Sequence, residues 1–205
     1  MKKGLTLVGA LLTAIIWVTV MIVGWSVGRG AAPSAQLAGV VVNPAANHYY
    51  ISIDTPAMLG GDEATGPAYV PSAMTLPANT DVTVTITNFD GATALPSGSE
   101  QYAKATGIKG SLTIEAIDTV HPNATGAVTT ATSLDPATGM SHTFTIAKLG
   151  LNVPLAPQSS TTFTFHTGAA GVYDWRCMDP CGSGPAGWGA AMSNDGFMQG
   201  KVTFA

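Results

Sequence analysis

Apolar residues occupy every second position in several short runs of the chain, and Pro, Gly, Asn and Asp separate these runs. The clearest are DVTVTITN at 81–88 and STTFTFH at 160–166. Successive side chains of an extended chain point to opposite faces, so this alternation predicts strands with one face in a core. We expect strands over 49–53, 73–76, 82–87, 111–114, 142–146, 161–165, 172–175 and 201–204. No window after residue 28 repeats apolar residues every 3.6 positions, so the pattern predicts an all-β sandwich or barrel.

The N-terminal part of the chain carries a different pattern. Residues 4–28 contain no charged side chain, and a helix of that length spans a hydrocarbon core of roughly 30 Å. Lys2 and Lys3 precede the run, which predicts a cytoplasmic N-terminus and export of everything that follows. A cleaved signal peptide is the alternative, because 31–35 offers small residues to a peptidase, but the apolar run exceeds the usual signal length.

These patterns divide the chain into three parts. We expect a membrane anchor or signal peptide at 1–29, a linker at 30–46 and a single β domain at 47–205. The stretch 88–135 is rich in Gly, Ala, Thr and Ser, and we expect long loops there. On this interpretation the protein is a single-pass cell-membrane protein whose globular domain lies on the periplasmic or extracellular side.

Charge and motifs exclude several classes of function. The chain has 8 basic and 12 acidic residues, so no basic surplus favours nucleic-acid binding. The motifs of serine hydrolases, zinc proteases and phosphate-binding loops are missing from the sequence, and no pattern pairs its carboxylates. We therefore do not expect the chain to be an enzyme on its own.

The last forty residues hold the side chains with distinctive chemistry. Both cysteines of the chain lie there, as Cys177 and Cys181, and Met192 and Met198 follow them. His142 opens a strand-like run 35 residues before the first cysteine. Thiolate and thioether sulfurs are soft ligands that suit copper, and imidazole suits it too. Strands of a sandwich would bring these distant positions to one end of the fold.

The segment GVYDWRCMDPCG resembles the copper-A motif of cytochrome oxidase subunit II. The matching positions are Gly171, Tyr173, Cys177, Cys181 and Gly182, with acidic Asp179 at the place of the family's Glu. The chain end GFMQGKVTF resembles the finish of rusticyanin- and sulfocyanin-like cupredoxins, and His142 lies in the His-x-Phe context of the first histidine ligand in both groups.

The resemblance implies a cupredoxin-like Greek-key β-sandwich that holds one or two copper ions. The implied ligands are His142, Cys177, Cys181 and Met198, with the main-chain carbonyl of Asp179 as a further one. It also implies an electron carrier of a respiratory chain, either free-standing or as a divergent subunit II of a terminal oxidase. The expected partner is a redox protein such as a cytochrome or the terminal oxidase itself.

The sequence departs from the copper-A pattern at the second histidine. Pro185 stands at that place, and no histidine follows Cys181. Met198 lies ten positions later than the pattern requires, so the loop before it resembles an insertion. Three alternatives follow: Met192 replaces the nitrogen ligand, a residue of another strand such as His166 replaces it, or the metal site is altered or lost.

Simpler interpretations of the same residues stay open. Cys177 and Cys181 could form a structural disulfide, since exported proteins meet an oxidising compartment. His142 could be an ordinary, partly buried histidine. The alternative function is then a degenerate cupredoxin without redox copper, which acts as an interaction or assembly module or delivers copper.

Overall fold

The structure is a computed structural model, and it describes residues 47–61, 66–117 and 125–205. The predicted anchor and linker lie outside the described residues. Among those residues, none of the helices is long and apolar enough to cross a membrane. The strands are β1 (His48–Asp54), β2 (Ala68–Val70), β3 (Ala73–Leu76), β4 (Asp81–Asn88), β5 (Ile108–Ile117), β6 (Thr125–Ala131), β7 (His142–Ile146), β8 (Leu151–Leu155), β9 (Ser159–His166), β10 (Gly171–Arg176) and β11 (Gln199–Phe204). Short 3-10 turns are η2 (Glu100–Ala103), η3 (Ala147–Leu149), η4 (Pro185–Gly187) and η5 (Ala190–Met192).

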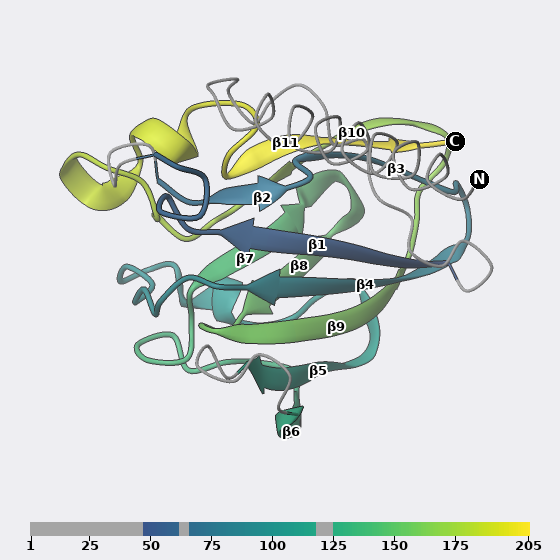
Figure 1. The fold of residues 1–205 in the computed structure, drawn as a ribbon. Helices are drawn as coiled ribbons and strands as arrows, with labels where there is room; N and C mark the ends of the chain where they lie inside the picture. Colours follow the sequence, from purple (N-terminus) through teal and green to yellow (C-terminus); the bar gives the residue numbers. More distant parts are fainter. Residues whose placement is uncertain (1–46, 62–65, 118–124) are drawn as a thin grey trace, which may run out of the picture. The chain divides into compact units, whose positions relative to one another are not determined.

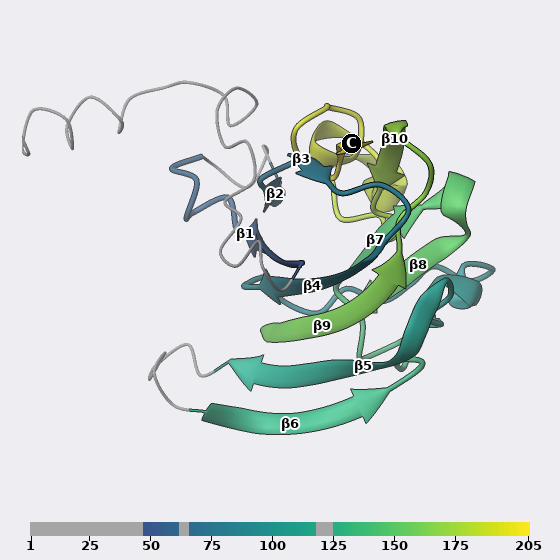
Figure 2. The same cartoon turned by 90° about the vertical axis from the view of Figure 1, so that its right-hand side faces the viewer.

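The strands form two sheets. One has the order β2-β1-β4-β9-β5-β6, and the other has the order β3-β11-β10-β7-β8 (Figures 1 and 2). The pairs β1–β4 and β3–β11 are parallel, and every other recorded strand pair is antiparallel. Many spatial neighbours are distant in sequence, so the two sheets bring the ends of β4, β7 and β10 within reach of one another.

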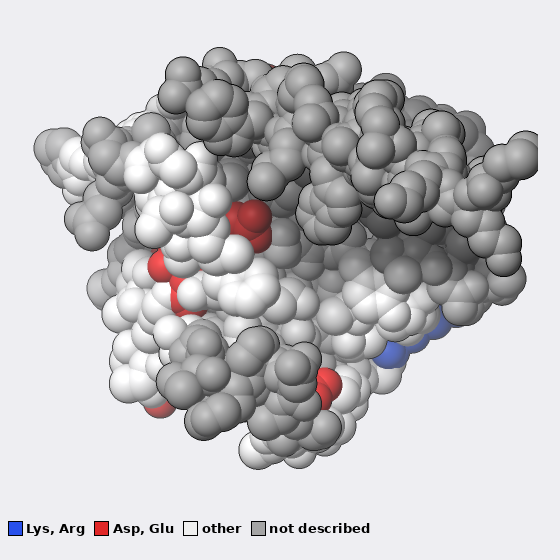
Figure 3. All heavy atoms as spheres, in the orientation of Figure 1, with Lys and Arg blue, Asp and Glu red and all other residues white. Residues whose placement is uncertain are grey.

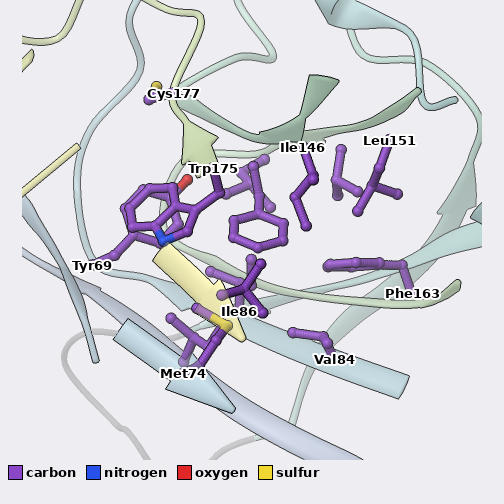
Figure 4. Packing of buried hydrophobic residues seen from close by; sticks show 14 of the residues in the cluster. Tyr69, Met74, Val84, Ile86, Ile146, Leu151, Phe163, Trp175 and Cys177 are labelled. Carbon is purple, nitrogen blue, oxygen red and sulfur yellow. The ribbon is translucent and has the colours of Figure 1, made fainter. Parts of the chain in front are cut away.

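The core lies between the sheets and consists of the apolar side of each alternating strand. Val82, Val84 and Ile86 of β4 are almost fully buried, as are Phe163 and Phe165 of β9. In the opposite sheet, Trp175 of β10 packs against Phe144 of β7 at a ring distance of 5.5 Å. Trp175 also packs against Tyr69 of β2, in the first sheet, at 4.5 Å (Figure 4). Fully burying one such side chain contributes about 1.5–3 kcal/mol, so this alternation largely accounts for the sandwich.

All eight predicted strands are present: β3 and β7 have the predicted bounds, and the others are longer, β5 by six residues. Three other strands, β2, β6 and β8, were not predicted, for physical reasons. β8 is buried along its whole length and therefore shows no alternation, and Pro154 within it is tolerated because β8 is the edge of its sheet. β2 has only three residues, which is too short for a period.

The expectation of long loops over 88–135 was wrong in part. β5 runs for ten residues within that stretch, and β6 pairs with it as an edge strand. The side chains described in β6 are exposed or half-buried, so a sequence rich in Gly, Ala and Thr can form a strand there without an apolar face. The sequence signal was missing because β6 contributes little to the core.

Candidate metal centre

The strand β10 delivers the first cysteine to the end of the sandwich. Tyr173 and Trp175 point into the core, and Cys177 continues their alternation one position beyond the strand. Its main-chain N–H donates to the carbonyl of Met198 at 2.8 Å, which extends the pairing between β10 and β11 past the last strand residue. Figure 4 shows Cys177 beyond Trp175, at the edge of the aromatic core.

Three donor atoms converge at this end of the fold. His142 Nδ1, Cys177 Sγ and Cys181 Sγ all lie within 4.8 Å of one another. The imidazole Nδ1 is 3.0 Å from Cys181 Sγ, and the two sulfurs are 3.4 Å apart. Both cysteines are free thiols, so the structure contains no disulfide between them. His142 and Cys177 are fully buried and Cys181 is half-buried, which leaves the cluster enclosed but close to the surface.

The loop between Cys181 and β11 brings a third sulfur to the cluster. Cys181 Sγ lies 3.6 Å from Met192 Sδ, and Met192 is fully buried in η5. The loop is fixed from two sides: Arg176 Nη2 donates to the carbonyl of Met192 at 3.3 Å, and the N–H of Met198 donates to Ala191 at 3.1 Å. The inserted segment is therefore a folded arm that carries a thioether to the cysteines (yellow-green in Figure 1).

Asp179 contributes its main chain to the cluster and has a buried side chain. Its carbonyl oxygen accepts from the thiol of Cys181 at 2.9 Å and lies 3.4 Å from Cys177 Sγ. Its side chain is fully buried, and neither carboxylate oxygen has a hydrogen-bond partner. Burial and the negative Cys177 sulfur raise the pKa of Asp179 to about 7. A buried carboxylate without a partner is costly, so burial favours the neutral form of Asp179, and a cation bound nearby would favour its charged form.

The strand β7 also supplies a donor to the cysteine sulfur. The N–H of Thr143 points at Cys177 Sγ at 3.3 Å, and its hydroxyl accepts from the N–H of Met178 at 2.7 Å. The hydroxyl of Tyr69 donates to the carbonyl of Thr143. Sequence reasoning missed Thr143 and Tyr69, since only tertiary pairing brings them to the cluster.

The residues of the cluster shift one another's pKa values. Burial alone would raise the pKa of Cys177, but hydrogen bonds from Cys181, His142 and the N–H of Thr143 outweigh it and hold the pKa well below its usual value. The hydrogen bond to Cys177, together with burial, raises the pKa of Cys181. Burial opposes a charged His142, yet the hydrogen bond to Asp90 and the nearby Cys177 sulfur raise its pKa to about 9. Cys177 is therefore the more acidic sulfur of the pair.

The other sequence-predicted residues have different surroundings. Met198 is fully buried, and its recorded contacts with the cluster run through its main chain. His166 is exposed at the end of β9 and pairs with Asp81 at 2.8 Å, so it is not the replacement ligand. Pro185, at the place of the family's second histidine, lies in η4. Within the described parts of the chain, the cluster contains one imidazole.

The donor set fits a soft or borderline metal ion. Two cysteine sulfurs, one imidazole and a thioether are the ligand types that copper accepts, and the hard oxygen cage that magnesium or calcium needs is missing from the cluster. The donors are already close together in the folded chain, so binding an ion requires no large rearrangement.

No protein-family model matches the chain, and no curated protein matches it by sequence. Solved structures do match. A reduced auracyanin from Roseiflexus castenholzii has 18% identity, covering 78% of this chain and 97% of its own, at a TM-score of 0.34. A chain of a heme-copper terminal oxidase dimer has 12% identity, covering 98% and 100%, at 0.32. The copper protein rusticyanin has 18% identity, covering 78% of both chains, at 0.28.

These matches are to proteins of the kinds that the sequence motifs resemble, namely cupredoxins and a terminal oxidase. At identities and TM-scores this low, no ligand or activity of these proteins is assigned to the present chain.

Proposed function

We propose that this protein is a copper-binding electron-transfer protein whose metal is held by His142, Cys177 and Cys181. Met192 and the carbonyl of Asp179 complete the ligand set, and Met198 is the further candidate at the start of β11. The observation that carries the proposal is the convergence of one imidazole nitrogen and two cysteine sulfurs within 4.8 Å at the end of a rigid sandwich.

Copper bound there would supply a one-electron couple at a site close to the protein surface. The chain's own residues do the rest. The N–H of Thr143 and the carbonyl of Asp179 hold the two sulfurs, and the pairing of β10 with β11 fixes their strand ends. Because strands and hydrogen bonds hold the donors, their geometry changes little when the charge of the site changes. Little reorganisation favours fast electron transfer over bond-making chemistry.

The number of ions depends on how the two sulfurs are shared. Cys177, Cys181 and His142 would hold one ion. A second ion would need a further donor, and Met192 Sδ, 3.6 Å from Cys181 Sγ, is a candidate. Metal analysis of the purified protein distinguishes one copper from two.

We also propose the cellular setting predicted from the sequence. Residues 4–28 would anchor the chain in the cell membrane, with the copper domain on the periplasmic or extracellular side. The partner would be a redox protein such as a cytochrome or a terminal oxidase. On the described, non-grey part of the face in Figure 3, the acidic side chains lie among uncharged atoms.

The test is metal content and colour, measured on the full-length chain loaded with Cu(II) under conditions that keep both cysteines reduced. Thiolate ligation predicts stoichiometric copper and intense visible absorption. Cys177→Ser should weaken and shift the absorption, and the double variant Cys177→Ser/Cys181→Ser should abolish it, because a hydroxyl is a hard, weak donor. A wild-type chain that retains no copper would refute the proposal and favour a degenerate interaction module.

A further inference from the structure

His142 makes a second contact on the side of its ring that faces away from the cysteines. Its Nε2 lies 3.2 Å from Oδ2 of Asp90. The imidazole is fully buried, whereas 31% of the Asp90 side chain is exposed. Asp90 follows β4 by two positions and is 52 residues before His142, so the contact joins the two sheets of the sandwich.

The main chain fixes Asp90 before it meets the histidine. Its N–H donates to the side-chain oxygen of Asn88 at 3.0 Å, and its carbonyl accepts from Gln158 at 3.1 Å. Its other carboxylate oxygen, Oδ1, accepts from the N–H of Gly91 at 2.8 Å. Asn88 is held in turn by the carbonyl of Ala156, at 2.9 Å. With Oδ1 held by the main chain, Oδ2 is left to receive the ring N–H.

We propose that Asp90 is a positioning residue of the metal centre, which fixes His142 with Nδ1 towards the cysteines and strengthens it as a ligand of the oxidised metal. The proposal rests on the proposed copper function and names a residue that the cluster of donors does not include. A carboxylate that accepts from one imidazole nitrogen keeps the proton on that nitrogen and leaves the other free to bind a metal. It also makes the ring a stronger electron donor, which stabilises Cu(II) more than Cu(I).

The chain contains a matched carboxylate–histidine pair that should have no such effect. Asp81 contacts His166 at 2.8 Å and also pairs with Lys109, with both acid and histidine largely exposed. Asp81 opens β4 and Asp90 follows its end, and at the strand rise the two ends of β4 lie roughly 23 Å apart. Figure 1 shows the arrowhead of β4 on the same side as the loop that carries Met192.

The experiment compares full-length wild type with Asp90→Asn, Asp90→Ala and the control Asp81→Asn. Asparagine keeps the size of Asp90 but carries no charge. Gly91 and His142 face different carboxylate oxygens, so in asparagine an NH2 group replaces one of these two acceptors. We expect Asp90→Asn and Asp90→Ala to weaken Cu(II) binding by about 10- to 100-fold. Cu(I) binding should weaken less, so the reduction potential should rise. Asp81→Asn should leave both affinities and the potential unchanged.

The two readouts separate positioning from a purely structural role. Loss of fold would weaken Cu(I) and Cu(II) binding alike and lower the unfolding midpoint of the metal-free protein, whereas Asp90→Asn should leave that midpoint close to wild type. The inference is overturned if wild type binds copper and Asp90→Asn has the same affinities and potential. If wild type binds no copper with its cysteines reduced, the proposed function itself has failed.

Discussion

The hydroxyl of Tyr69 donates a 2.9 Å hydrogen bond to the main-chain carbonyl of Thr143, across 74 positions of the sequence. The N–H of the same Thr143 faces Cys177 Sγ, so one residue is held on its carbonyl side and serves a candidate metal ligand on its amide side. Tyr69 also packs against Trp175. The aromatic core therefore determines where the start of β7, and with it His142, meets the cysteines.

Tyr69→Phe removes the hydroxyl and keeps the ring. The buried carbonyl of Thr143 then loses its donor, and we expect the free energy of unfolding to fall by about 1–3 kcal/mol. Tyr173→Phe is the matched control, because the Tyr173 hydroxyl donates to the carbonyl of Ala169 only four residues away, in a turn at the strand start. Chemical denaturation should show the larger loss for Tyr69→Phe; equal losses would contradict the bracing role.

Met192→Leu and Met198→Leu separate the two candidate thioether ligands. Both changes nearly conserve volume and should cost less than about 1.5 kcal/mol of stability each. Met192 Sδ contacts Cys181, so we expect Met192→Leu to keep the visible colour and to shift the reduction potential more than Met198→Leu does. Voltammetry of the two copper-loaded variants measures the shift. A larger shift in Met198→Leu would identify Met198, just before β11, as the thioether ligand.

Copper affinity should increase with pH. The pKa of His142 in the metal-free protein is raised from 6.5 to about 9, so the charged ring stabilises the folded, metal-free protein. This stabilisation is fully present below a pH of about 6.5 and is lost as the pH rises through about 9. A metal needs the neutral ring, so binding at neutral pH releases at least one proton. Metal competition assays between pH 6.5 and 9 should show affinity rising with pH; a flat profile would contradict a protonated His142.

Gly182→Ala should disturb the arm that carries Met192. A Cβ at residue 182 would lie 2.0 Å from the carbonyl oxygen of Gly189 and 3.0 Å from Met192 Cγ. Since the backbone oxygen cannot move independently, the loop must shift, at a cost of about 1–3 kcal/mol. We expect a shifted reduction potential of the copper-loaded variant together with this loss of stability. An unaltered potential would indicate that Met192 is not a ligand.

The alternation of apolar and polar residues predicted the strands that build the core, because those strands have one buried and one solvent-facing side. β6 and β8 escaped because one is exposed on both sides and the other is buried on both. Ligand types and spacing suggested His142, Cys177 and Cys181. Asp90 carries no local signal in the sequence. It becomes a partner of His142 only because the fold brings the end of β4 next to the start of β7.

The most direct test of the central claim is a potentiometric titration of the copper-loaded, full-length chain, followed by its visible absorption. A thiolate-bound copper site predicts an absorption that bleaches on reduction and returns on oxidation along a one-electron curve, with the double variant Cys177→Ser/Cys181→Ser colourless throughout. A chain that retains no copper while both thiols are reduced, or whose bound copper shows no thiolate absorption in any oxidation state, would contradict the account.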